Sequence, residues 1–187
     1  GGIAGLEGLT WAIGLCLLPG LIEPHTHPDL CAQCYAWVDV SGFRHPKVEQ
    51  VERALRDAVA ATPPGEWIFA FGLDPMLTPD LGTWNRARLD AIAPDHPLAV
   101  VIQSMHTLYF NTAALHRAGV REDAPDPPGG GRYQRDADGR LTGKLEEPAA
   151  LLPFLRFDVP TEEQLKSRMW DQYRRYAAAG ITTIGIP

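Results

Sequence analysis

Two histidines separated by a single residue, His25 and His27, have a spacing that suits the binding of one metal ion. They follow the segment LLPGLIE at residues 17–23, which is typical of a turn and then a buried parallel strand. Because side chains alternate along a strand, both imidazoles are expected on the same side. Two neutral imidazoles can hold one Zn²⁺, and a catalytic zinc site keeps a further position open for water. The pattern therefore predicts a metal-dependent hydrolase, and the alternative is a pair of surface or turn histidines.

Length and charge limit the class of protein. The chain has 187 residues, 45% of them hydrophobic, and a formal net charge of −6. This fits a soluble globular protein, but a complete eightfold barrel takes about 250 residues. Because position 1 is not Met and a strand is expected just before the last residue, we interpret the chain as a fragment. The negative charge predicts no nucleic-acid or anionic membrane partner.

Three cysteines, Cys16, Cys31 and Cys34, are an odd number, which argues against a secreted disulfide framework and favours the cytoplasm. The apolar residues 3–22 lack the basic start of a signal peptide, because the first basic residue is Arg44. The spacing of Cys31 and Cys34 could mark half a zinc site or a redox pair. No second pair completes a structural zinc site, so ordinary buried thiols are the simpler interpretation.

The order of elements predicts an α/β protein with mostly parallel strands. Apolar spacing and capping signals predict helices at 46–61, at 83–92 with Thr83 as its cap, at 111–119 and at 161–180. Strands are expected at 9–13, 66–72, 97–103, 141–147 and 181–184. Residues 28–40 are expected to form a loop whose Tyr35 and Trp37 either line a pocket or pack as aromatics. Residues 121–140 are polar and indicate a loop or small insertion.

Three segments carry a family resemblance. PGLIEPHTH at 19–27 resembles the Pro-Gly-Phe-Ile-Asp-x-His-x-His signature of metal-dependent amidohydrolases. HTLYFNTAAL at 106–115 is similar to His-Thr-x-x-x-Asn-Ser-x-Ala-Leu, and DPPGGG at 126–131 with the residues up to 147 agrees in order and spacing. From about residue 17 onward the chain therefore resembles the amino-terminal part of the amidohydrolase 3 family, in the branch acting on N-substituted amides and formamides.

The resemblance implies a fold and a reaction. The fold is a partial (β/α)₈ TIM barrel of the metal-dependent hydrolase type, with residues 1–16 as the remnant of an N-terminal β-sandwich or a lead-in. Residues 17–187 would be the first part of the barrel, with the polar insertion around 121–140. The reaction is hydrolysis of a non-peptide C–N bond in a small-molecule amide or N-substituted formamide, through water activated by one or two divalent ions, with zinc expected. A homo-oligomer is left open.

The resemblance also assigns residues. His25 and His27 would be metal ligands, and Glu147 matches a glutamate that can bridge two ions, although Lys144 and Glu146 depart from the family pattern and compete with it. His106 follows a predicted strand and is expected to bind substrate, with a structural histidine as the alternative.

The resemblance implies that the general base and further ligands come from later strands, beyond residue 187. The three remaining histidines do not fill those positions: His45 precedes a helix, His96 sits in a turn and His116 lies inside a helix. The alternative function is a non-catalytic, truncated or degenerate barrel module. A third interpretation of the sequence is a redox protein in which Cys31 and Cys34 form a reversible disulfide.

Overall fold

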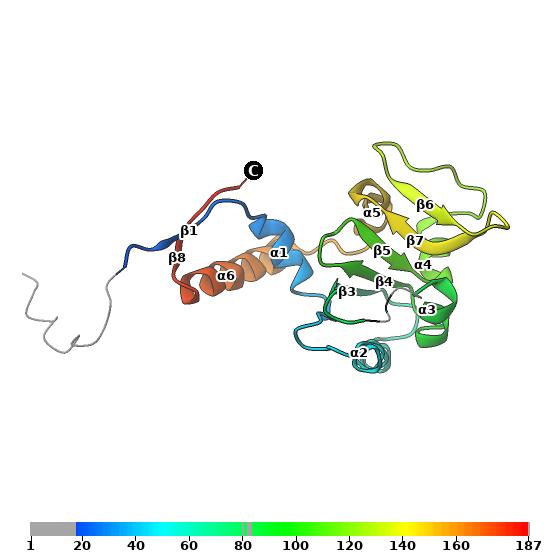
Figure 1. Ribbon diagram of the computed structural model, residues 1–187, viewed down its shortest axis with the longest axis horizontal. Helices are drawn as coiled ribbons and strands as arrows, with labels where there is room; N and C mark the ends of the chain where they lie inside the picture. The colour runs from blue at the N-terminus through cyan, green and yellow to red at the C-terminus, as the bar shows by residue number, and fades with distance from the viewer. Residues whose placement is uncertain (1–17, 80, 82–83, 187) are drawn as a thin grey trace, which may run out of the picture.

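The strand that precedes the histidine pair, β1 (Leu21–Glu23), pairs in parallel with β8 (Ile181–Ile184), far away in the sequence. The computed structural model describes residues 18–79, 81 and 84–186. Helix α6 (Glu162–Ala178) leads into β8 and packs against α1 (Pro28–Cys34), which follows β1. These four elements, which we call the β1–β8 unit, lie to one side of the rest of the molecule (Figure 1).

The other strands form one six-stranded sheet. Their order is β2-β3-β4-β5-β7-β6, and the sheet is mixed: β2, β3 and β4 run parallel, whereas β5 is antiparallel to β4 and to β7, and β6 is antiparallel to β7. In sequence the whole sheet lies between β1 and β8. The strands are β2 (Val38–Asp39), β3 (Ile68–Leu73), β4 (Leu98–Ile102), β5 (Thr107–Phe110), β6 (Arg132–Arg135) and β7 (Leu141–Glu146).

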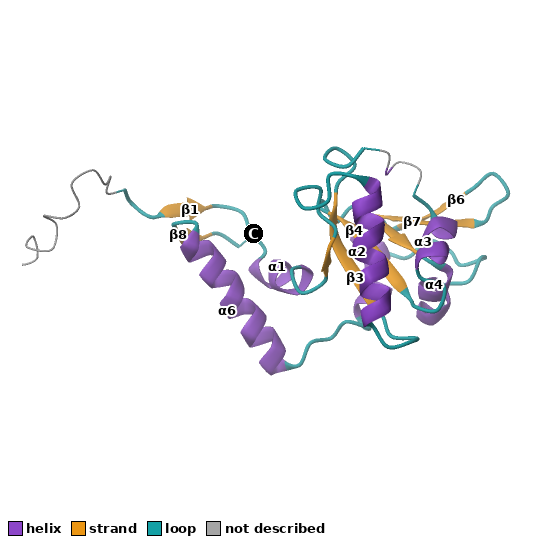
Figure 2. Cartoon of the chain, turned by 90° about the horizontal axis from the view of Figure 1, so that it is seen from below, coloured by secondary structure: helices purple, strands orange, loops and turns teal. Residues whose placement is uncertain are grey.

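Helices cover both faces of this sheet. On one face, Val100 packs in a cluster with residues of α2 (Val48–Ala61) and α3 (Arg86–Ile92). On the other, Val101 packs with α4 (Thr112–Ala118) and α5 (Pro148–Leu155). Figure 2 shows α2 crossing in front of β3 and β4. A strand buried on both faces needs apolar residues at every position, which explains the uninterrupted apolar run of β4.

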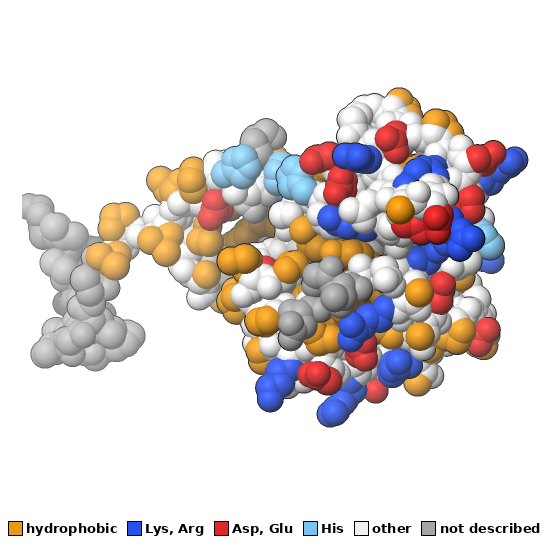
Figure 3. Space-filling model, turned by 45° about the vertical axis from the view of Figure 1, so that its right-hand side comes forward, with side chains coloured by type: hydrophobic (Ala, Val, Ile, Leu, Met, Phe, Trp, Pro, Cys, Tyr) orange, Lys and Arg blue, Asp and Glu red, His pale blue; other side chains and the backbone are white. Residues whose placement is uncertain are grey.

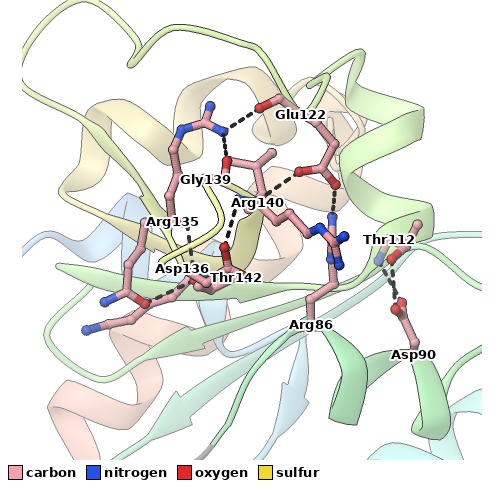
Figure 4. A network of polar contacts seen from close by, with 12 residues as sticks. Arg86, Asp90, Thr112, Glu122, Arg135, Asp136, Gly139, Arg140 and Thr142 are labelled. Carbon is pink, nitrogen blue, oxygen red and sulfur yellow. Dashed lines mark hydrogen bonds and ion pairs between the residues drawn. The ribbon is translucent and has the colours of Figure 1, made fainter.

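A polar network fixes the segment predicted as an insertion (Figure 4). The Glu122 carboxylate accepts hydrogen bonds from Arg86 and, at 2.9 Å, from the backbone amide of Leu141. The Arg135 guanidinium donates to three backbone carbonyls, among them Gly139 at 2.8 Å. The segment is therefore ordered by charge-assisted hydrogen bonds to backbone groups, where a loop would otherwise leave those groups to water.

Several predicted elements are confirmed, and some are wrong. The helices at 48–61, 112–118 and 162–178 and the strands at 68–73, 98–102, 141–146 and 181–184 agree with the sequence expectation within a few residues. The expected loop at 28–40 instead contains α1 and β2, and the insertion contains β6. The mostly parallel sheet was also a wrong prediction. A few residues join β4 to β5, too few for the crossover that parallel strands need.

β1 is not the buried strand that its sequence predicted. Leu21 and Ile22 are 57% and 69% exposed, because β8 is its one neighbouring strand in the described part of the chain. The described strands form an open mixed sheet and a separate parallel pair, so the barrel remains a prediction. The strand at 9–13, the β-sandwich remnant and the Thr83 cap lie outside the described residues. Within the described residues, no helix has the length and apolar character needed to cross a bilayer.

Candidate functional site

His25 and His27 lie in the short segment between β1 and α1. Thr26, between them, contacts the Tyr176 hydroxyl of α6 through its own hydroxyl at 2.8 Å, and its amide donates to the Gly185 carbonyl at 3.0 Å. The flanking imidazoles lie with their ring centres 5.6 Å apart and their planes at 89°. Thr26 therefore ties the segment to α6 and to the end of β8, while both histidines open into one cleft.

The cleft has a volume of about 590 Å³ and lies between the β1–β8 unit and the six-stranded sheet. His106, which follows β4 and directly precedes β5, lines the same cleft, so the structure brings three of the predicted site residues to one space. Figure 3 shows histidine side chains gathered on one face of the molecule, with acidic side chains beside them. The rest of the lining is mostly apolar or uncharged and includes Leu30, Cys31, Tyr35, Phe71, Gln103, Met105 and Pro148.

Glu147 contacts His106 rather than the histidine pair. Its carboxylate Oε2 lies 2.8 Å from Nδ1 of His106, and its backbone amide donates to the His106 carbonyl at 2.9 Å. The antiparallel register of β5 and β7, with Thr107 opposite Glu146, brings the two residues together. A carboxylate at Nδ1 favours a proton on that nitrogen and leaves Nε2 for another partner.

The backbone is strained on both sides of this contact. Met105 has φ 61° and Glu147 has φ 69°, and among the described residues these two are the non-glycine residues with positive φ. Glu147 combines that φ with ψ 147°, a conformation that residues other than glycine rarely adopt. Strain of this kind persists where the surrounding structure imposes it, and it concentrates at binding and catalytic sites.

The two competing residues of β7 point elsewhere. The Lys144 ammonium pairs with the Glu146 carboxylate at 3.2 Å. Glu146 lines a separate hollow of about 360 Å³ together with Arg132, on the β6 side of the sheet. Of the three residues considered as bridging ligands, Glu147 is therefore the one that contacts a residue of the cleft lining, His106.

The spacing of the two imidazole rings is compatible with two ligands of one ion. An ion bound at a ring nitrogen lies ~3.2 Å from the ring centre, so two imidazoles at a tetrahedral angle have centres ~5 Å apart, close to the 5.6 Å observed. However, within the described residues no three His, Cys, Asp or Glu side chains gather closely enough to hold a metal. The structure therefore supplies two candidate donors and does not bring Glu147 to them as a third.

Two other candidate residues are poorly suited to this chemistry. Burial, with smaller effects of Cys31 and Asp158, raises the pKa of Cys34 to about 12, so its thiol stays protonated at neutral pH and is a poor nucleophile and ligand. His96 is buried with Nδ1 3.3 Å from the Glu66 carbonyl.

His45, just before α2, and His116, within α4, are likewise absent from the lining of the histidine cleft in the described structure.

A second hollow, of about 450 Å³, adjoins the histidine cleft. Its lining includes Tyr35 and Trp37, for which a pocket was one of two expectations, and two arginines that carried no signal in the sequence, Arg44 and Arg175. Arg175 lies on α6, so its approach to the hollow depends on how α6 packs against α1, which local sequence patterns do not encode.

Comparisons with known proteins agree with the family resemblance. The model of a family described as "Amidohydrolase family" matches residues 12–186. The chain is 30% identical over 180 residues to N-substituted formamide deformylase of Arthrobacter pascens, covering 92% of this chain and 32% of that protein. It is 33% identical over 176 residues to exoenzymes regulatory protein AepA of Pectobacterium carotovorum subsp. carotovorum, covering 91% of this chain and 37% of that protein.

Among solved structures, an uncharacterized metal-dependent hydrolase from Pyrococcus horikoshii matches with a TM-score of 0.54 at 21% identity, covering 89% of this chain and 30% of that one. This likeness supports a shared fold. The chain spans about a third of the length of the curated relatives it matches.

Proposed function

The chain belongs to the amidohydrolase family, and on that premise we propose that the protein is a metal-dependent hydrolase cleaving a carbon–nitrogen bond other than a peptide bond. The observation that carries the proposal is the cleft into which His25, His27 and His106 all open. The substrate class, a small amide or N-substituted formamide, is suggested by the deformylase from Arthrobacter pascens.

We assign His25 and His27 as two ligands of a divalent ion, with zinc proposed. When bound there, the ion would lower the pKa of a bound water to about 7 and polarise the substrate carbonyl. Glu147 orients His106 through Nδ1, and His106 presents Nε2 to a polar group of the substrate. The apolar part of the cleft lining offers a surface on which an apolar part of the substrate can pack.

We keep two roles for Glu147, that of a metal ligand and that of a residue that orients His106, and experiment can distinguish them. A ligand and an orienting residue differ in what their removal changes. If Glu147 binds the ion, Glu147→Gln lowers metal affinity; if it orients His106, metal affinity stays and substrate turnover falls.

We also propose that β1 and β8 are neighbouring strands of a (β/α)₈ barrel. A parallel strand pair joined through a helix is the repeating unit of that fold, and β1, α6 and β8 have this arrangement. The histidines follow the carboxyl end of β1, the end at which barrel enzymes place their active sites. The six-stranded sheet would then be inserted between two barrel strands.

The test of the proposed reaction uses metal content and product release. The full-length protein is incubated with Zn²⁺ or Co²⁺, desalted and analysed for bound metal, and N-substituted formamides are then assayed for released formate. We expect bound metal and formate release that a chelator abolishes. His25→Ala and His27→Ala should lose the metal, whereas His116→Ala, on the exposed side of α4, should keep it.

A second candidate function is a non-catalytic module of the same fold. Two observations favour it: no three donor residues gather in the described structure, and one relative is named a regulatory protein. A folded sample that binds neither Zn²⁺ nor Co²⁺ and releases no formate would support the module and contradict the hydrolase.

A further inference from the structure

The second hollow shares four residues with the histidine cleft: Cys34, Tyr35, Phe71 and Gln103. The two spaces therefore adjoin along one wall made by the end of α1, by β3 and by the residue that follows β4. A molecule with one end near the histidines could extend past this shared wall into the second hollow. The residues that line the second hollow then determine which chemical group of the ligand can bind there.

The shared wall and its extension are aromatic and held in place. Tyr35 and Phe71 meet edge to face, with ring centres 6.4 Å apart. Trp37 stacks on Phe69 at 5.1 Å, and its indole N–H donates to the Asp158 carboxylate at 2.6 Å. Rings fixed in this way offer flat apolar surface to a ligand at little cost in conformational entropy.

Two guanidinium groups line the same hollow. Arg175 lies over the Tyr35 ring, 5.1 Å from its centre. Within the described part of the chain, no ion pair joins Arg175 to a carboxylate. The Arg44 guanidinium forms an ion pair with the Asp39 carboxylate at 3.4 Å. The lining thus has one positive charge in excess, in a protein whose overall charge is −6. Because the whole molecule repels anions, anion binding here has to come from these local groups.

We propose that this hollow is a subsite for a carboxylate carried by an aromatic or other apolar group. The single excess charge matches a monoanion better than a phosphate dianion, and a guanidinium fork can bind a carboxylate through two parallel hydrogen bonds. The inference rests on the proposed function for the reaction at the histidines, and it narrows the substrates to amides whose part remote from the scissile bond ends in a carboxylate.

Binding of two small probes tests the subsite without any turnover. Phenylacetate and phenylacetamide have nearly the same shape, but only phenylacetate is charged at neutral pH. Ligand-observed NMR titration of the metal-free protein should give a Kd at least about tenfold lower for phenylacetate, as expected for a charge-assisted pair. Equal affinities, or no binding of phenylacetate up to about 10 mM, where the free energy of binding is below ~3 kcal/mol, would overturn the proposal.

Matched variants assign the effect to one side chain. Arg175→Gln should remove the preference for phenylacetate, and Arg175→Lys should keep part of it because the charge remains. The control is Arg174→Gln, which removes the same charge from the adjacent position of α6, where Arg174 pairs with Asp171 at 3.0 Å. Loss of binding in both glutamine variants would indicate a general charge effect and overturn the subsite.

Two further results separate this inference from others. Tighter binding of phenylphosphonate than of phenylacetate would overturn the assignment to a carboxylate. The probes bind without metal, so intact, Arg175-dependent binding in a protein without formamide hydrolysis would support the subsite and contradict only the proposed reaction. The reverse result would contradict only the subsite.

Discussion

His106 and Glu147 are joined twice, by a 2.8 Å contact between side chains and by a 2.9 Å hydrogen bond between backbones. The side chains are 62% and 52% exposed, so the pair adds little to stability. Its double connection instead places one imidazole in the cleft and favours a proton on its Nδ1. This relationship leads to the first two predictions.

Glu147→Gln should release the His106 ring without changing the fold. We expect a proton fixed on Nδ1 of neutral His106 in the parent protein and a mixture of tautomers in the variant, visible in the ¹⁵N shifts of the labelled imidazole. If His106 binds substrate, formamide turnover should fall about 10–100-fold, the range for loss of a carboxylate that orients a site histidine. Glu146→Gln, which loses a pairing with Lys144 outside the cleft, is the control. Unchanged ¹⁵N shifts in Glu147→Gln would contradict the orienting role.

Glu147→Gly should stabilise the protein while removing the site carboxylate. The backbone at Glu147 has φ 69° and ψ 147°, where glycine avoids the strain of ~1–3 kcal/mol that a side chain incurs. After the entropic cost of glycine, we expect the free energy of unfolding to rise by about 1 kcal/mol in urea titrations. Glu146→Gly lies in regular strand β7 and should lose about 1 kcal/mol. A destabilised Glu147→Gly would show that the contact with His106 outweighs the strain.

The elements that could be predicted from the sequence are those with a clear local signal, such as an apolar run or a helix cap. The run at 98–102 is apolar at every position because both faces of β4 are covered, and Asn111 and Gly119 cap α4 as their types predict. The short strands β5 and β6 were missed. Their four residues each give too little periodicity. In addition, one of the two strands that pair with β5 is β7, which lies far along the chain.

The site was partly predictable for a similar reason. The His25–His27 spacing is local, so it could be recognised from the sequence. The His106–Glu147 pair is separated by 41 positions and forms only because β5 and β7 adopt one antiparallel register. The exposure of β1 was not predictable either, because burial of a strand depends on what lies across from it. Arg175 reaches its hollow through the packing of two helices, which leaves no trace in local sequence.

Glu122→Gln should reduce stability at neutral pH and have less effect in acid. Hydrogen bonds from Arg86 and from the Leu141 amide hold the pKa of the Glu122 carboxyl below its usual value. A carboxyl with a lowered folded-state pKa stabilises the protein above its unfolded-state pKa, about 4.3, and this stabilisation is lost as the pH falls through the folded-state pKa. Because the side chain is 56% exposed, we expect less than about 1 kcal/mol at pH 7.

The measurement for Glu122 is urea unfolding of the parent and variant between about pH 3 and pH 7. The difference in free energy should shrink toward acid, and it should also shrink when Glu122→Gln is made in an Arg86→Gln background, since the partner is then already absent. A difference that does not depend on pH would mean that the carboxylate charge is not what orders the segment.

Asn111→Ala, at the N-cap of α4, should be strongly destabilising. The Asn111 side chain is fully buried and makes four hydrogen bonds to backbone groups, two accepted by Oδ1 and two donated by Nδ2, at 2.8–3.0 Å. Removing the amide leaves those buried backbone groups unpaired, for an expected loss of about 3 kcal/mol in the free energy of unfolding. Asn85→Ala removes the same side chain from an exposed helix cap, with one hydrogen bond at 3.1 Å, and should cost only about 1 kcal/mol. Equal losses for the two variants in urea titrations would mean that the hydrogen bonds of Asn111 contribute no more than an exposed helix cap does.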